Sequence, residues 1–447
     1  MIKLRYYLQF FFTLCITITC ISQEEVKEVN PYKKLSKSFF GAVKREIPNR
    51  NDKFFDSSFY GKISASQTDR TIDNFIRMNG KIIAIEKTEV DTQGCKMVTA
   101  TSIKTLNGKF LWYLYFDQAQ YIQRLAIDTF SDQWFYKQHP LTTTNFTRQE
   151  ITIESNPFIK LPGSLYLPIT SKNVGAVILV HGSGPHDRNC SIGRNKIFTD
   201  IALDLVQKGI AVLVYDKRTY VYQYHDPFPM DSMDFQSETI DDAVAAFNFL
   251  KQQKGIDTTK LFIAGHSQGA LCAPLIAKKC NNLKGLILLA APARSLLEII
   301  PEQLDYIASL STKKDEKAEE QATAIKWQVN NALKPNLTLS SKMILPFGAR
   351  PKYWLFDRNY KVLEVAKTIT LPILLVQGGR DYNVTKKDYD LWIEAMKGKS
   401  NFKSVYFEDL DHLFFLGQGM AKPEDVMKPN YVSGKVTAKM IEFITGK

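Results

Sequence analysis

One pentapeptide, Gly265-His-Ser267-Gln-Gly269, places a serine between two glycines. The apolar run 261–264 before it predicts a buried strand, and residues 270–279 after it predict a helix. In this strand–turn–helix setting G-x-S-x-G forms a sharp elbow that presents the serine hydroxyl at the end of the strand. The alternative is a glycine-flanked turn with an idle serine, which the flanking strand and helix disfavour. The pattern predicts that Ser267 is a nucleophile.

A serine hydroxyl is a weak nucleophile until a base takes its proton, so a histidine must lie within hydrogen-bond reach. On an elbow of this kind the acid, and then the base, follow the serine in the chain. Of the six histidines, His412 alone follows Ser267, in the loop after a strand predicted over 402–407. His412 is therefore the predicted base; the alternative is a surface loop histidine.

The carboxylate that orients this base should follow a strand between the serine and the histidine. Asp381 does so, directly after the strand predicted over 371–377 and a glycine pair that lets the loop turn. There its carboxylate would fix the imidazole tautomer and stabilise the imidazolium. Asp409 and Asp411 are rivals by sequence proximity, but they flank the histidine too closely to reach its far nitrogen, and we interpret them as loop-shaping residues.

When the serine attacks a carbonyl carbon, the carbonyl oxygen becomes an oxyanion, and two backbone N–H donors are required to stabilise it. One is predicted to be that of Gln268, the residue after the nucleophile. The other is predicted to be that of Ser183, with Gly184 second, in the glycine-rich loop that follows the strand predicted over 175–180. Gly182 and Gly184 let this loop approach the reacting carbonyl, so both are also predicted to contact substrate.

Two other interpretations of the same loop are weak. A phosphate-binding loop would require a Lys-Ser or Lys-Thr after the glycines, and none follows. His181 and His186 lack a third partner for a metal, and the spacing of the four cysteines that follow the predicted signal peptide matches no zinc pattern. The sequence therefore predicts neither a metal nor a cofactor.

Length and composition indicate ordinary globular protein in two or three domains. The chain has 447 residues, of which 45% are hydrophobic and 23% charged. The net charge is +12, but the basic residues are scattered and form no stripe that a nucleic acid could follow. No nucleic-acid partner is expected.

The N-terminus predicts export. Lys3 and Arg5 precede a short apolar core, and residues 1–22 together match a secretory signal peptide. The core is short for a membrane-spanning helix, so we expect no integral span after its removal, and a secreted or periplasmic protein. A lipoprotein anchor at Cys20 is a minority alternative, because residues 17–19 fit that signal poorly.

Residues 30–138 predict a small α+β accessory domain. A helix-like stretch over 30–46 is followed by segments rich in β-branched and aromatic residues, and Asn107-Gly108 between two of them is a strong hairpin signal. The predicted strands are 81–90, 95–106, 109–116 and 121–130. The segment carries no catalytic constellation, and homo-oligomerisation through it is one of its candidate roles.

Residues 148–447 predict an α/β domain with a mostly parallel, eight-stranded sheet and helices on both faces. An antiparallel entry hairpin precedes the regular alternation of strands and helices. The predicted strands are 149–154, 163–167, 175–180, 210–215, 261–264, 283–290, 371–377 and 402–407, and the main helices are 197–208, 240–252, 270–279 and 431–444.

About eighty residues separate two of these strands, far more than a usual connection. This insertion, 293–368, contains helical patterns over 296–307 and 313–333 and an aromatic cluster at Tyr353 and Trp354. We expect it to form a cap above the elbow, with Tyr353 and Trp354 in the substrate wall. The alternative is a decorative helical excursion.

The motifs around Gly182, Asp216-Lys-Arg, Ser267, Asp381 and His412 together resemble the exported α/β-hydrolases of the serine-aminopeptidase-like and carboxylesterase group. The resemblance is specific over most of 148–447. It implies the α/β-hydrolase fold, the triad Ser267, Asp381 and His412, hydrolysis of small acyl esters, and a cone-like accessory domain like the one predicted here. One departure is visible: residues 219–227 form a tyrosine-rich loop where relatives have a glycine-rich turn.

Three functions remain to be distinguished. The first is a serine carboxylesterase that acts on small or medium acyl groups, free or glycan-linked, through an acyl-enzyme. The second is a peptidase or acyl-aminopeptidase, because the same triad can cleave an amide. The third is a non-catalytic binding protein on the same fold, which the presence of all three triad residues disfavours.

Overall fold

The computed structural model describes residues 30–45, 54–55, 65–93, 96–117, 119–129, 145–169, 173–193, 195–223, 226–310 and 315–446. The predicted signal peptide, including Cys20, lies outside these residues. The chain divides into two compact units, with the boundary after Tyr136. Within the described residues, none of the helices combines the length and the apolar character that crossing a membrane requires.

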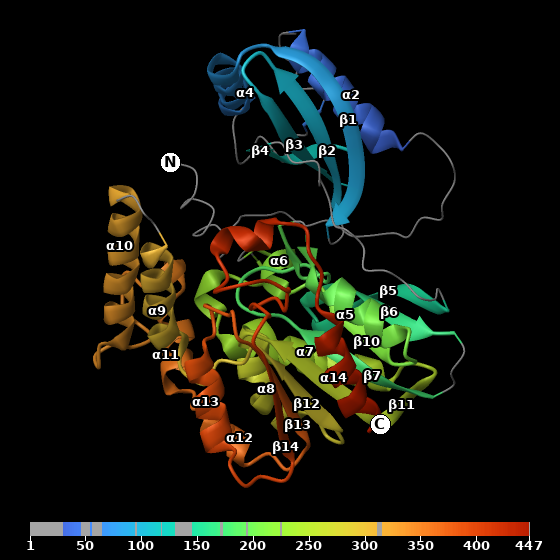
Figure 1. Ribbon diagram of the computed structural model, residues 1–447, viewed down its shortest axis with the longest axis vertical. Coiled ribbons are helices and arrows are strands. Elements are labelled where there is room, and N and C mark those ends of the chain that lie inside the picture. The colour runs from blue at the N-terminus through green and yellow to red at the C-terminus, as the bar shows by residue number, and fades with distance from the viewer. Residues whose placement is uncertain are drawn as a thin grey trace. The chain divides into compact units, whose positions relative to one another are not determined.

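In its described residues, the N-terminal unit is a four-stranded antiparallel sheet in the order β1-β2-β3-β4 with two helices (Figure 1). The Asn107-Gly108 turn joins β2 to β3, where the Thr105 N–H donates to the Gly108 carbonyl. Phe40 and Phe75 both pack edge-on against Trp112 and form part of its core. The elements are α2 (Pro31–Lys44), α4 (Ala65–Asn79), β1 (Ile82–Gln93), β2 (Lys96–Thr105), β3 (Lys109–Phe116) and β4 (Ile122–Thr129).

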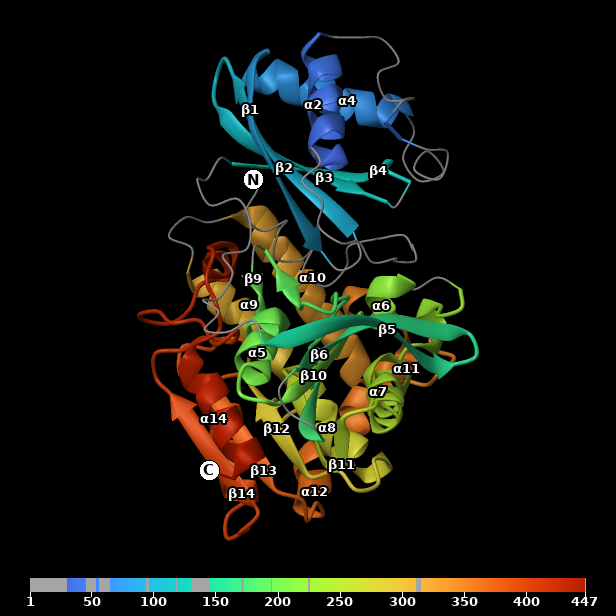
Figure 2. The same cartoon turned by 90° about the vertical axis from the view of Figure 1, so that its right-hand side faces the viewer.

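The larger unit contains an eight-stranded sheet in the order β14-β13-β12-β11-β7-β10-β6-β5. The β5–β6 hairpin is antiparallel and joins one edge of the sheet, while β7 and β10 to β14 are parallel to one another (Figure 2). The predicted fold class is therefore confirmed. The strands are β5 (Phe146–Asn156), β6 (Ile159–Pro168), β7 (Val174–Val180), β10 (Ala211–Tyr215), β11 (Ile256–His266), β12 (Gly285–Leu289), β13 (Ile373–Gly378) and β14 (Phe402–Phe407).

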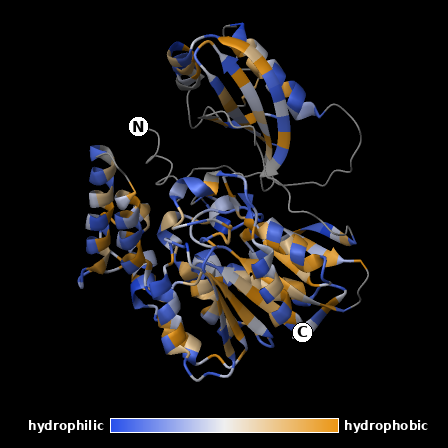
Figure 3. Ribbon diagram, in the orientation of Figure 1, coloured by the Kyte–Doolittle hydropathy of each residue, from blue (hydrophilic) through white to orange (hydrophobic). Residues whose placement is uncertain are grey.

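Helices cover both faces of this sheet because its parallel strands are apolar on both sides. Alternate residues of β7 point to opposite faces: Ile178 packs in one core with α7 and α8, and Leu179 packs in the other with α5 and α14. The central strands are correspondingly hydrophobic along their length (Figure 3). The helices are α5 (Ile197–Val206), α7 (Asp241–Lys251), α8 (Gln268–Lys279) and α14 (Gly434–Thr445).

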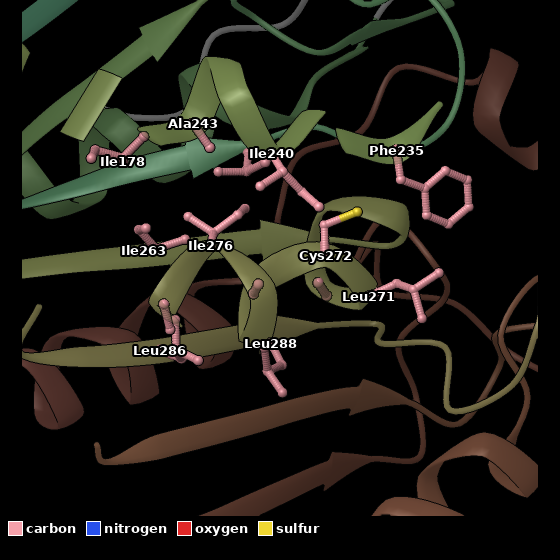
Figure 4. Close-up of a cluster of buried hydrophobic side chains, with 14 of the residues drawn as sticks. Ile178, Phe235, Ile240, Ala243, Ile263, Leu271, Cys272, Ile276, Leu286 and Leu288 are labelled. Carbon is pink, nitrogen blue, oxygen red and sulfur yellow. The ribbon is translucent and has the colours of Figure 1, made fainter. Parts of the chain in front are cut away.

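The helix α8 lies at the centre of the first core. Figure 4 shows Leu271, Cys272 and Ile276 of α8 among side chains of the strands on one side and of residues 235–243 on the other. Full burial of an aliphatic side chain is worth about 1.5–3 kcal/mol. This packing fixes the helix, and with it the turn that carries Ser267, relative to the sheet.

The insertion between β12 and β13 is largely helical, as predicted for the cap. Its first two helices pack side by side (Figure 1). The buried carboxylate of Asp357 on α11 accepts the backbone N–H groups of Leu296 and Leu297, which tethers the start of α9. The helices are α9 (Leu296–Ser309), α10 (Glu316–Leu333), α11 (Pro351–Asn359) and α12 (Val362–Lys367).

A buried arginine ties the loop after β7 to the strands beside it. Arg188 is 1% exposed; it donates to both carboxylate oxygens of Asp216 and to the Gly163 carbonyl, and it pairs with Glu150. This one side chain therefore connects the glycine-rich loop, the end of β10 and the β5–β6 hairpin.

We expect Arg188→Met to lower the free energy of unfolding by about 3–5 kcal/mol, because it leaves the Asp216 carboxylate buried without its partner. Urea denaturation measures this loss. Arg350→Met is the matched control, since the Arg350–Asp231 pair is exposed and should contribute less than about 1 kcal/mol. Equal losses in the two variants would contradict the role given to Arg188.

Candidate active site

Ser267 lies on a strained turn between β11 and α8. Its backbone has φ 55 and ψ −120, a region that residues other than glycine rarely adopt, and its N–H donates to the Leu289 carbonyl at 2.8 Å. The flanking glycines are required by space. A Cβ at position 265 would lie 2.3 Å from the Gly269 oxygen, and one at 269 would lie 2.3 Å from the Val180 oxygen. The serine is half-buried, while its neighbours on either side are buried.

His412 and Asp381 form a hydrogen-bonded pair. The distance from His412 Nδ1 to Asp381 Oδ2 is 2.7 Å. The other carboxylate oxygen accepts the N–H groups of Asn383 and Val384, and Gln377 Nε2 donates to Oδ2. The carboxylate is 1% exposed, so these donors replace water around its charge. The pair is thus held rigidly at the carboxyl end of β13.

His412 is also fixed next to the elbow. His266, the residue before Ser267, donates from Nε2 to the His412 carbonyl at 2.9 Å, and the two rings lie 4.8 Å apart. Ser267 and His412 both lie in the part of the chain that the structure describes, and no hydrogen bond joins the Ser267 hydroxyl to the His412 ring. Catalytic hydrogen bonds of this type are often long until a substrate is bound. The structure therefore brings the three predicted triad residues to one end of the sheet.

Within the described residues, neither rival carboxylate forms a hydrogen bond or an ion pair with the His412 ring. Asp409 pairs with Lys435 near the surface. Asp411 is buried and accepts the N–H groups of Leu413 and Phe415, which closes the loop around His412. Asp411 thus holds the loop together, and Asp409 ties the loop to α14.

Burial raises the pKa of Asp411 to about 6, against the opposing effect of these two N–H donors. Because the pKa of an unfolded aspartate is about 3.9, the folded state holds this proton more tightly. The stability from this group is therefore present below about pH 4 and is lost as pH rises through about 6.

We expect this titration to be absent from Asp411→Asn, whose amide oxygen can accept the same two N–H groups. Between about pH 4.5 and about pH 7.5, wild type should lose on the order of 2–3 kcal/mol more stability than the variant. Urea denaturation at both pH values measures the difference. Parallel losses in the two proteins would contradict the assignment.

The glycine-rich loop after β7 lies against the serine. A Cβ at Gly182 would lie 3.1 Å from Ser267 Cβ, which is tighter than most contacts of this kind, so glycine favours the approach. The Ser183 carbonyl accepts a hydrogen bond from His186 Nε2, and Gly184 has φ 88. Gly182 thus lies beside the elbow, and Gln268 directly follows Ser267. The predicted roles of Gln268 and Ser183 as oxyanion donors, and the predicted contacts of Gly182 and Gly184 with substrate, stay predictions.

Other histidines beside the site are held neutral. Burial lowers the pKa of His266 to about 3 and of His186 to about 4, and it lowers the pKa of the buried His181 well below its usual range. None of these three imidazoles is charged near neutral pH. No cluster of three or more metal-binding side chains occurs in the part of the chain that the structure describes. His139 and His225 lie outside the described residues.

The cap aromatics are more enclosed than the sequence suggests. Tyr353 and Trp354, on α11, are 7% and 2% exposed and pack in the same core as α8. The Tyr353 hydroxyl accepts a hydrogen bond from Gln268 Nε2 at 2.7 Å. Their predicted contact with substrate stays a prediction, and the contact of Tyr353 with the elbow is an addition to it.

Sequence reasoning missed a buried ion pair at this site. Lys217 and Glu238 lie 2.9 Å apart, and Lys217 also contacts Gln268 and the Gly182 carbonyl. One signal was available: Lys217 stands between Asp216 and Arg218 directly after a wholly apolar strand. Charged residues at the carboxyl end of a buried strand often belong to a site.

Comparisons with known proteins agree with this architecture. The family model described as serine aminopeptidase, S33, matches residues 171–417. The esterase EstD of Thermotoga maritima is 37% identical over 300 residues, which cover 67% of this chain and 68% of that protein.

Solved structures of similar fold include Est1E from Butyrivibrio proteoclasticus, with 19% identity and a TM-score of 0.43 over 66% of this chain and 98% of that one. The esterase PF2001 of Pyrococcus furiosus has 18% identity and a TM-score of 0.45 over 70% and 98% of the two chains. The family match spans more than half of the chain and contains the elbow, Asp381 and His412. This chain therefore belongs to the serine aminopeptidase (S33) family of α/β-hydrolases and is a hydrolytic enzyme.

Proposed function

We propose that this enzyme is a carboxylesterase that cleaves esters of small or medium acyl groups through an acyl-enzyme formed on Ser267. The observation that carries the proposal is the 2.7 Å hydrogen bond between His412 and Asp381, with His412 held against the residue that precedes Ser267. The similarity to the Thermotoga esterase supports an ester as substrate.

In the proposed reaction His412 takes the hydroxyl proton as Ser267 Oγ attacks the ester carbonyl carbon. The carbonyl oxygen becomes an oxyanion, which accepts hydrogen bonds from the N–H groups of Gln268 and Ser183. When the intermediate collapses, the C–O bond to the alcohol breaks and His412 gives its proton to the leaving oxygen. Water, activated by the same histidine, then releases the acid and restores the serine.

Asp381 has a supporting part in this scheme. Its carboxylate accepts a hydrogen bond from the Nδ1–H of His412, so Nε2 is left free to act as the base. The same carboxylate stabilises the imidazolium that forms during each proton transfer. Three further donors hold it in place, so it does not need to reorganise as the charge develops.

Amide cleavage is the second candidate function, since the family description names an aminopeptidase and the same triad can attack an amide. We also propose that the protein is exported, on the basis of the signal-like N-terminal residues 1–22. We further propose that the natural substrate includes glycan-linked esters, and that the protein forms homo-oligomers through its N-terminal unit.

A substrate panel tests the function. The mature protein would be offered p-nitrophenyl esters of increasing acyl length, aminoacyl anilides and a fluorophosphonate probe. Ester turnover with labelling of Ser267 would support the carboxylesterase, and anilide turnover in preference to esters would favour the peptidase. Failure of the probe to label Ser267, with no turnover of either class, would leave only a non-catalytic binding role.

A further inference from the structure

A single buried lysine contacts both halves of the predicted oxyanion hole. Lys217 Nζ donates to the Gly182 carbonyl oxygen at 2.8 Å and to Gln268 Oε1 at 3.2 Å. The side chain is 2% exposed, and the Glu238 carboxylate, 2.9 Å away, balances its charge. A buried ammonium is tolerated only when it is paired and hydrogen-bonded, as this one is.

The first contact orients the peptide group that carries one predicted donor. The Gly182 carbonyl and the Ser183 N–H belong to the same peptide unit, which is trans. In a trans peptide the two groups point in opposite directions, so a lysine that holds the carbonyl fixes the direction of the N–H. A cation at the carbonyl also polarises the unit and makes its N–H a stronger donor.

The second contact anchors the residue that carries the other predicted donor. Gln268 is the first residue of α8, and its buried side-chain amide is held on both ends. Its oxygen accepts from Lys217, while its nitrogen donates to the Tyr353 hydroxyl at 2.7 Å and to Glu238 at 3.3 Å. The peptide between Ser267 and Gln268 is thereby fixed from outside the elbow.

We propose that Lys217 is the positioning residue of the oxyanion hole, and that Tyr353 extends the same network to the cap. The inference rests on the proposed function, because it presupposes an oxyanion. Since Glu238 neutralises the lysine, the hole stabilises the oxyanion through oriented N–H dipoles and presents no free charge to a neutral ester.

The first test removes the lysine and its counterion together, so that no buried charge is left unpaired. In the double variant Lys217→Met, Glu238→Gln we expect kcat for a p-nitrophenyl ester to fall about 100-fold, with KM within about twofold of wild type. The matched control is Arg218→Met, Asp242→Asn, which removes the neighbouring buried ion pair. This control should lose thermal stability to a similar extent but keep kcat within about twofold.

A transition-state analogue separates positioning from a general loss of structure. A trifluoromethyl ketone adds to the serine and places an oxyanion in the hole. Its inhibition constant should rise in the Lys217 double variant by the factor by which kcat/KM falls. The affinity of the parent methyl ketone should change by less than about twofold, because only oxyanion stabilisation is altered.

A milder pair of variants decides the question if the double variant does not fold. Tyr353→Phe removes the hydroxyl that Gln268 binds, while Tyr360→Phe removes a hydroxyl that donates to the Leu271 carbonyl on the same helix. We expect kcat to fall about tenfold in the first variant and to stay unchanged in the second. In a Gln268→Met background, Tyr353→Phe should have no further effect on kcat.

Several results would overturn the inference while leaving the proposed function intact. These are wild-type kcat in Tyr353→Phe, equal losses of kcat in the two tyrosine variants, or an unchanged inhibition constant in the Lys217 double variant. A wild-type protein that hydrolyses no ester and whose Ser267 resists the fluorophosphonate would overturn the proposed function itself.

Discussion

Ser267→Ala is expected to lower kcat for ester hydrolysis by about 10⁴-fold or more and to abolish labelling by a fluorophosphonate. The reason is that the proposed mechanism takes as its nucleophile the hydroxyl of Ser267, which lies on the strained turn with φ 55 after β11. Alanine has a similar backbone preference, so the elbow should keep its shape. Stopped assays with p-nitrophenyl acetate and intact-mass measurement of the labelled protein would measure both effects.

The control for this variant is a serine-to-alanine change away from the site. Ser404→Ala removes a hydroxyl on the edge strand β14 that accepts a hydrogen bond from the Tyr389 hydroxyl. This variant should keep full activity and full labelling. If Ser267→Ala kept more than about a tenth of wild-type kcat, the acyl-enzyme mechanism would be wrong. Labelling that persists at another serine in Ser267→Ala would point to a different nucleophile.

Asp381→Asn is expected to lower kcat by about 10⁴-fold while the protein stays folded. The amide oxygen of asparagine can still accept hydrogen bonds from the N–H groups of Asn383 and Val384. Its amide nitrogen, however, cannot accept the hydrogen bond from the Nδ1–H of His412. The imidazole would then adopt the wrong tautomer, with its proton on the nitrogen that must receive the serine proton. Steady-state kinetics together with a thermal melt would separate this effect from unfolding.

Two aspartates near the histidine serve as comparisons. Asp409→Asn removes a surface pair with Lys435, and Asp411→Asn keeps an acceptor for the loop N–H groups, so both should retain most of the activity. If Asp381→Asn kept full activity while Asp409→Asn or Asp411→Asn were inactive, the orienting carboxylate would be a residue of the loop that carries His412.

Much of the catalytic unit could be predicted from the sequence because its parallel strands are short and apolar on both faces. The strand predicted over 402–407 coincides with β14, and the helix predicted over 296–307 begins where α9 begins. The elbow could be located because its two glycines are required by space, as the 2.3 Å approach of position 269 to Val180 shows. The predicted positions of Asp381 and His412 follow from the order of the strands.

Several of the described helices were not predicted from the sequence, for different reasons. In α13 (Lys386–Ala395) Leu391 and Ile393 are exposed while Asp388 and Trp392 are buried, so the apolar periodicity is blurred. In α11, Pro351 reads as a chain break although it occupies a first-turn position, where proline is favoured. In α4, which is otherwise mostly polar, Ile72, Phe75 and Ile76 have the i, i+3, i+4 spacing of an amphipathic helix and pack in the core of the N-terminal unit, a signal that was missed.

The hydrogen-bond network around Lys217 could not be predicted, because its members lie in separate connections between strands. Gly182 follows β7, Lys217 follows β10 and Gln268 follows β11, and these strands are neighbours only in the folded sheet. No spacing in the chain indicates that an ammonium from one loop binds the carbonyl of another. Tyr353 lies in the insertion, and no pattern in the sequence predicts the path of the insertion over the sheet.

The link between Tyr353 and Gln268 matters for any attempt to re-engineer this enzyme. The chain enters the insertion after β12 and leaves it before β13, and this single insertion point makes it look like an exchangeable module. A donor segment grafted between those ends would have to supply a hydroxyl at the place of Tyr353. Chimeras that lack one should still take up their new substrates but turn them over slowly.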